Sequence, residues 1–148
     1  KDPDFPLNKG FIKGEKVLEA GDNFGTGSSR EHAPWGLQDW GFEAIISTKF
    51  ADIFRLNSIN IGLVPIEANQ ENVEALFSKI DTDSETIIEI SIEDKTVVCG
   101  DISFSFSLDD FSQKRIIEGL DKIDITLGYL DKIENFSQSR KHWKPKLV

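Results

Sequence analysis

The segment G-D-N-F-G-T-G-S-S-R-E-H, residues 21–32, decides the fold of this chain of 148 residues. A short apolar stretch at 16–20 precedes it and is typical of a strand, and a helical stretch follows it from about residue 31 to residue 40. The glycines within the segment allow the tight turn that joins such a strand to such a helix. A strand, a glycine-rich turn and a helix in this order predict the first unit of an α/β domain.

Strands and helices continue to alternate through the first half of the chain. Residues 42–47 are apolar enough for a strand buried on both faces, and residues 50–59 are the next helix candidate. A strand follows at 62–66, where a proline indicates a sheet edge or a strand end. Asn69 then begins a helix whose apolar residues recur at i, i+3, i+4 and i+7, namely Val73, Leu76, Phe77 and Ile80.

In the middle of the chain the pattern changes to that of antiparallel strands. Residues 88–92 alternate between apolar and polar side chains, and residues 102–108 do the same. Between them, a turn at 94–95 leads into a further strand at 96–99. These three segments predict a meander beside the α/β units.

The last third of the chain is predicted to be helical. Asp109 is expected to start a helix in the neighbourhood of 113–118, and Gly119 is expected to end it. The whole order of elements predicts one α/β domain over 1–148 with a three-layer β/β/α architecture, a mixed sheet and flanking helices, and it argues against a bundle or a sandwich. Beyond Gly119, spacings of three and four indicate a helical face formed by Leu120, Ile123, Leu127, Leu130, Ile133 and Phe136.

Composition excludes several classes of protein. Lys and Arg number 17 against 26 Asp and Glu, a formal net charge of −9, so clustered phosphate contacts and nucleic-acid binding are not expected. No apolar run approaches the roughly 20 residues that a membrane span needs, and no export signal is present, so we expect a cytoplasmic location. The sequence contains no methionine, from which we expect natural N-terminal residues to be missing.

The chain is not expected to bind a metal by itself. Cys99 is the only cysteine, follows a strand-like run and is predicted to be buried. His32 and His142 lie too far apart in sequence for a zinc-ligand spacing. An iron–sulfur cluster needs several thiolates, so any cluster chemistry requires a partner that supplies the metal.

The glycine-rich segment has two interpretations from its residues alone. Gly27, Ser28, Ser29 and Arg30 stand before a helix start, where backbone N–H groups, hydroxyls and a guanidinium would bind a small anion or stabilise a serine alkoxide. Alternatively, S-x-x-E at 28–31 is a capping box, worth about 1 kcal/mol. The nearby proline at 34 weighs against that cap, because a proline inside the helix costs about 3 kcal/mol. The segment lacks the G-K-[ST] of a phosphate loop and the G-x-G-x-x-G of a dinucleotide site.

Residues 21–35 (G-D-N-F-G-T-G-S-S-R-E-H-A-P-W) resemble the signature of the aconitase-like swivelling-domain family, most closely its 3-isopropylmalate dehydratase small subunits. The resemblance continues through 41–65 and returns at 119–127 (G-L-D-K-I-D-I-T-L). It covers most of the chain and implies a three-layer β/β/α swivelling domain. The D-T-D-x-I-I-P stretch that the family carries upstream has no counterpart here.

The resemblance also implies a reaction. Members interconvert 2-isopropylmalate and 3-isopropylmalate by dehydration and rehydration in leucine biosynthesis, and the large subunit carries the [4Fe–4S] cluster. By the family pattern, Ser28 is the base that takes the proton, and Arg30 binds a substrate carboxylate. Ser29 and the N–H groups of the loop, Gly27 among them, complete the pocket.

Two other functions remain open from the sequence. The chain resembles, less closely, small subunits or domains of related hydro-lyases that act on homoaconitate, citraconate or methylmalate, or citrate. It also suits a non-enzymatic module that binds a carboxylate through the same loop. For the leading interpretation, the expected partners are a large subunit and a small dicarboxylate substrate.

Overall fold

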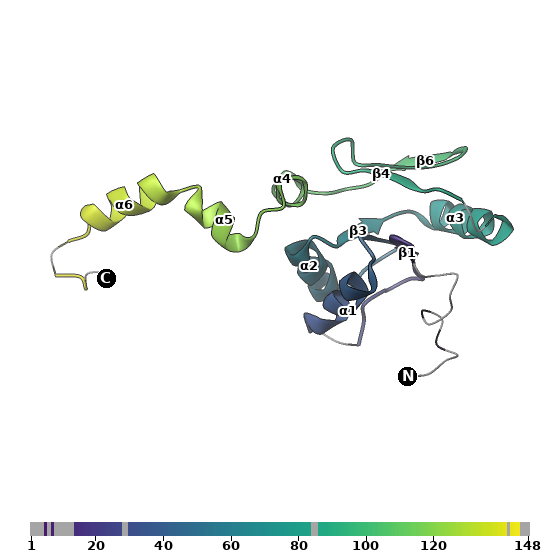
Figure 1. Cartoon of the computed structure of the whole chain (residues 1–148), viewed down its shortest axis with the longest axis horizontal. Coiled ribbons are helices and arrows are strands. Elements are labelled where there is room, and N and C mark those ends of the chain that lie inside the picture. Colours follow the sequence, from purple (N-terminus) through teal and green to yellow (C-terminus); the bar gives the residue numbers. More distant parts are fainter. Residues whose placement is uncertain are drawn as a thin grey trace.

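The computed structural model describes residues 5, 7, 14–27, 30–83, 86–141 and 143–145. A parallel sheet with strand order β1-β2-β3 forms the middle layer (Figure 1). Its central strand aligns Ile45 with Leu18 on one side and with Pro65 on the other. The sequence-predicted strands and crossover helices are thus confirmed, with the proline strand at the edge of this sheet. The elements are β1 (Val17–Glu19), α1 (His32–Trp40), β2 (Ala44–Ser47), α2 (Asp52–Ile61) and β3 (Val64–Glu67).

The second sheet is an antiparallel meander on the opposite side of the parallel sheet from α1 and α2 (Figure 1). Its central strand pairs with both neighbours, with Val97 opposite Ile90 and Phe104. The parallel and antiparallel strands, predicted to share one mixed sheet, are divided between two sheets among the described residues. The elements of this part are α3 (Gln70–Thr82), β4 (Glu89–Ser91), β5 (Thr96–Cys99) and β6 (Ile102–Ser105).

The core confirms the three-layer arrangement. Successive residues of β2 point to opposite faces of the parallel sheet, so Ile45 and Ile46 enter two different apolar clusters, and both are fully buried. On one face Ile45 packs among residues of α1, α2 and the loop before them, including Phe54. On the other face Ile46 packs with Leu76 of α3 and Val97 of the meander.

Local signals in the sequence placed the helix ends correctly. Gly41 follows α1 with φ 116°, and Gly119 follows α4 (Asp110–Glu118) with φ 62°, the left-handed conformation that glycine adopts without strain. Asn69 caps α3 by accepting a hydrogen bond from the Asn72 N–H at 2.8 Å. Asp109 starts α4, as predicted, because its side chain accepts a hydrogen bond from the Ser112 N–H at 2.9 Å.

The helical face predicted after Gly119 forms two helices, α5 (Lys122–Leu127) and α6 (Leu130–Gln138). The N–H of Gly128 donates to the Asp124 carbonyl, and Tyr129 leaves the helical conformation with φ −112° and ψ 17°, which separates them. Figure 1 shows both helices extending away from the two sheets. The apolar residues of this face are therefore largely exposed rather than packed, namely Ile123, Leu127, Leu130, Ile133 and Phe136.

Candidate functional site

The loop after β1 lies at the carboxyl ends of the parallel strands, where α/β sheets bind ligands. The buried hydroxyl of Ser47, at the end of β2, donates to the Gly21 carbonyl at 2.7 Å. Further along, the Phe24 N–H donates to the Lys49 carbonyl at 3.0 Å, and the Ala51 N–H donates to the Phe24 carbonyl at 2.9 Å. The first half of the loop is thus fixed to the segment between β2 and α2.

Aromatic packing holds the same half of the loop against α2. The ring of Phe24 makes edge-to-face contacts with Phe50 and Phe54, at centroid distances of 6.3 and 5.3 Å. Gly25 follows with φ 79° and lies directly against Phe54. Phe50 and Phe54 are buried in the cluster beneath α1 and α2, so the loop is anchored in the core.

The described residues in the second half of the loop are exposed. Gly27 has φ 96° with open space around it, and Arg30 is exposed just before α1. Ser28 and Ser29, predicted as the base and as a substrate ligand, lie outside the described residues. The described residues on either side of them, Gly27 and Arg30, are exposed, and Arg30 stands just before the N-terminus of α1.

The capping-box interpretation of S-x-x-E is wrong. α1 begins at His32, its N-cap residue is Glu31, and no side chain of the described residues caps it. Pro34 thus lies in the first helical turn, where its missing N–H and fixed φ are tolerated. A helix capped at residue 28 would have carried this proline farther inside, so the chain starts the helix later.

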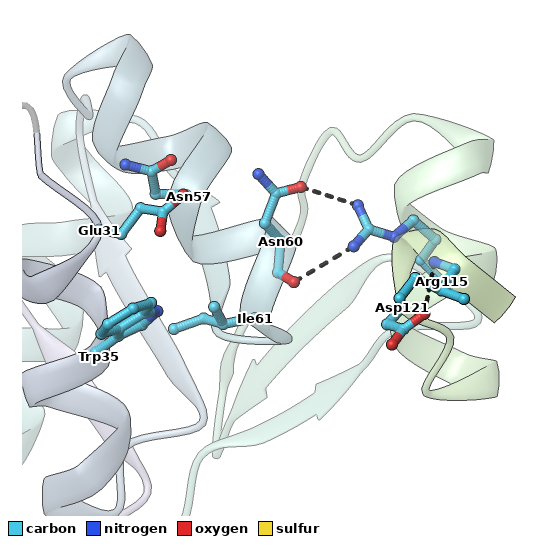
Figure 2. A pocket seen from close by; sticks show the side chains of 8 residues that line it. Glu31, Trp35, Asn57, Asn60, Ile61, Arg115 and Asp121 are labelled. Carbon is cyan, nitrogen blue, oxygen red and sulfur yellow. Dashed lines mark hydrogen bonds between the residues drawn. The ribbon is translucent and has the colours of Figure 1, made fainter. Parts of the chain in front are cut away.

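A cleft of about 310 Å³ lies beside α1, the helix that follows the loop (Figure 2). Glu31 and Trp35 line it from α1, Asn57 and Asn60 from α2, and Arg115 from α4. Figure 2 shows Glu31, Asn57 and Trp35 on one side and Arg115 on the other, with Asn60 between them. The cleft reaches the loop through Glu31, the residue after Arg30. Ile61, Asp121 and Ile123 complete its lining.

Arg115 is the residue at this cleft that sequence reasoning missed. Its guanidinium donates to the side-chain oxygen of Asn60 at 3.1 Å and to the Asn60 carbonyl at 3.3 Å, and only 8% of the residue is exposed. The two residues are 55 positions apart in sequence. No local pattern signals such a contact, since an arginine on a helix is ordinarily a solvated surface residue.

The most perturbed carboxyl group of the described chain lies on the other face of the sheet. Glu19 ends β1, and by the alternation of the strand it faces α3 and the meander together with Val17. Burial, with the negative charge of Asp81 nearby, raises the pKa of Glu19 to about 7. Because α1 and α2 cover the opposite face, Glu19 is not a member of the loop site.

Cys99 is fully buried, as predicted, and burial raises the pKa of its thiol. A buried thiol with a raised pKa is a poor nucleophile and a poor metal ligand. In the described ranges, no three His, Cys, Asp or Glu side chains are placed to hold a metal ion. The described helices include none with the length and apolar character to cross a membrane.

Comparisons with known proteins agree with one another. The profile of the aconitase C-terminal domain family matches residues 1–71. The 3-isopropylmalate dehydratase small subunit of Micrococcus luteus is 46% identical over 145 residues, which cover 98% of this chain and 72% of that protein. The one from Thermobifida fusca is 46% identical over 144 residues, covering 97% and 74%.

A solved structure shares the fold. The crystal structure of 3-isopropylmalate dehydratase from Methanocaldococcus jannaschii superposes with a TM-score of 0.58 at 29% sequence identity. The match covers 88% of this chain and 74% of that chain. The matches to the two small subunits cover nearly the whole length of the present chain, and so include both the three-layer arrangement and the loop after β1.

Proposed function

The chain belongs to the family of 3-isopropylmalate dehydratase small subunits, and we propose that it interconverts 2-isopropylmalate and 3-isopropylmalate together with a large subunit. The observation that carries the proposal is the loop at 21–32. It is fixed at the carboxyl ends of the parallel strands, presents Arg30 to solvent and leads into the start of α1. This is the place where an α/β sheet presents N–H groups and a guanidinium to an anion.

Arg30 is proposed to bind a carboxylate of the dicarboxylate substrate. A guanidinium pairs with a carboxylate through two parallel hydrogen bonds, which fixes the orientation of the substrate as well as its charge. Glu31, the N-cap residue, is an acidic side chain at the helix start, whereas the first turn of α1 adds no further acidic residue that would oppose an anion. Gly27 leaves open space beside the loop and lets its backbone approach the substrate closely.

Ser28 is proposed to be the base, with Ser29 as a further ligand of the substrate. In dehydration, the Ser28 oxygen takes the proton from the carbon next to a carboxylate and becomes a neutral hydroxyl. Donors directed at that oxygen lower its proton affinity, and the loop N–H groups together with Arg30 are the available donors. In rehydration, the same hydroxyl returns a proton to the alkene.

The large subunit is proposed to hold the [4Fe–4S] cluster. This chain does not fit a cluster, because its single cysteine is fully buried. Its own residues are proposed to remove the proton and to bind one substrate carboxylate, while the large subunit is proposed to assist departure of the substrate hydroxyl. We propose that the pair acts in the cytoplasm, in leucine biosynthesis.

The test is turnover of 2-isopropylmalate after anaerobic mixing of this chain, expressed from its complete gene, with the large subunit of the same organism. We expect activity only in the mixture. Ser28→Ala should lower kcat by about 10²–10⁴, and Arg30→Lys should raise KM because the paired hydrogen bonds are lost. Ser103→Ala, at an exposed position of β6, is the matched control and should leave both constants unchanged. Full turnover by Ser28→Ala would contradict the assignment of the base.

A further inference from the structure

We propose that Arg115 is a positioning residue for the substrate-binding loop, acting through Asn60 at the end of α2. The inference rests on the proposed function for its kinetic consequence, whereas its structural part concerns the described contacts alone. Arg115 touches neither the loop nor its helix α1 in any hydrogen bond of the described chain. Its effect on the loop must therefore pass through α2.

The first step is the contact between α4 and α2. Besides the two bonds to Asn60, the Nε–H of Arg115 donates to the Leu120 carbonyl at 3.5 Å. Asn60 lies in the last turn of α2, and Leu120 follows the end of α4. The cation thus lies where two helices present carbonyl groups and the negative ends of their dipoles. This fixes the end of α2 against α4.

The second step is the contact between α2 and the loop. Near its start, α2 carries Phe54 against Phe24 and Gly25, and the Ala51 N–H bonds the Phe24 carbonyl. At its far end, the Ile61 carbonyl accepts a hydrogen bond from the side chain of Gln38 on α1 at 2.7 Å. α2 therefore contacts both the first half of the loop and α1, the helix that follows the loop.

The third step is the choice of arginine at a buried position. No carboxylate of the described residues lies within ion-pair distance of Arg115, and Asp121, which lines the same cleft, interacts with its charge only from farther away. A buried cation without such a pair is a poor source of stability, because desolvation of the charge offsets what its hydrogen bonds contribute. A guanidinium that engages both the side chain and the backbone of Asn60 does, however, set the distance and the angle between α4 and α2.

The kinetic test compares Arg115→Met and Arg115→Lys in the assembled enzyme, well below their unfolding temperatures. Displacement of the loop should raise KM for 2-isopropylmalate by about tenfold in Arg115→Met. Arg115→Lys should recover part of this, since one ammonium still reaches the Asn60 carbonyl. The control is Val97→Ala, in the core on the other face of the sheet, which should lower stability and leave KM unchanged. A wild-type KM in Arg115→Met would overturn the proposal.

A second measurement does not depend on activity. Hydrogen exchange at the Phe24 and Ala51 amides, whose bonds fix the loop, should accelerate by about tenfold in Arg115→Met and much less in Val97→Ala. Equal acceleration of exchange in the two variants would mean that Arg115 only stabilises the fold as a whole, and would overturn the positioning role. If the wild-type mixture fails to turn over substrate while this difference persists, the proposed function fails and the positioning of the loop stands.

Discussion

The ring of Phe54 occupies the space that a side chain at Gly25 would need. A Cβ atom added to Gly25 would lie 2.2 Å from the Cγ atom of Phe54, far inside any normal contact. Gly25 also has φ 79°, in the left-handed region that other residues adopt with strain. The loop can cross α2 this closely only because residue 25 has no side chain.

Gly25→Ala is therefore expected to destabilise the chain by about 3 kcal/mol, from steric overlap together with backbone strain. Gly27→Ala is the matched control, because φ at Gly27 is 96° but nothing lies within 4 Å of an added Cβ. It should cost about 1–2 kcal/mol, the strain alone. Urea denaturation of both variants measures the difference. Equal losses of unfolding free energy in the two variants would show that Phe54 moves aside without a free-energy cost.

The carboxyl group of Glu19 makes stability depend on pH. Its two oxygens are inaccessible to solvent and make no hydrogen bond of normal geometry in the described chain, and the nearby Phe77 backbone offsets the effect of burial on the pKa only in part. Burial raises its pKa from 4.5 to about 7, so between these values the folded chain binds more protons than the unfolded one. The free energy of unfolding must then fall as pH rises from about 4.5 to 7. Below this window the contribution is fully present.

Glu19→Gln tests this linkage, because an amide of the same shape carries no charge at any pH. The variant should match the wild type near pH 4 and exceed its unfolding free energy by about 1–2 kcal/mol at pH 8, a figure reduced for the partial exposure of the residue. Denaturant titrations of both proteins across pH 4–8 supply the comparison. A difference that stays constant over this range would mean that Glu19 keeps an ordinary pKa.

The cap of α3 gives a smaller and more local prediction. The side-chain oxygen of Asn69 accepts a hydrogen bond from the Asn72 N–H at 2.8 Å. Asn69→Ala should lower the free energy of unfolding by about 1 kcal/mol, and Asn69→Asp should retain the cap. Thermal unfolding of the three proteins separates the cases. A loss in Asn69→Asp as large as that in Asn69→Ala would point to the amide group rather than the accepting oxygen.

Much of the fold could be predicted because its determinants are local. Asn69 begins α3, the glycines after α1 and α4 end them, and the alternating meander follows from its own sequence. The loop at 21–32 was located for the same reason, since its glycines and its position between a strand and a helix are adjacent in the chain. Its chemical role came from the family resemblance, because the residues alone left a helix cap open.

What could not be predicted depends on contacts between distant segments. The bond between Arg115 and Asn60 joins two helices across more than 50 positions, and spacing within one helix carries no information about it. Arg115 and Asn60 both line the cleft, so local sequence patterns do not predict the cleft either. Spacing likewise continued a helical face through Gly128 and Tyr129, where backbone geometry ends α5 and a new helix begins. Periodicity reports which face is apolar but not what covers that face.

The apolar face of α6 supplies the last prediction. No residue of this helix is buried, and Leu130 and Ile133 are 48% and 43% exposed. In the isolated chain, the double substitution Leu130→Asp, Ile133→Asp should change the free energy of unfolding by no more than about 0.5 kcal/mol, as expected for surface positions. Leu76→Ala, in the fully buried core beside α3, should cost about 2–5 kcal/mol in the same urea titration. A loss above about 2 kcal/mol in the double variant would mean that α6 packs against apolar surface in solution, because only burial makes a charge at these positions so unfavourable.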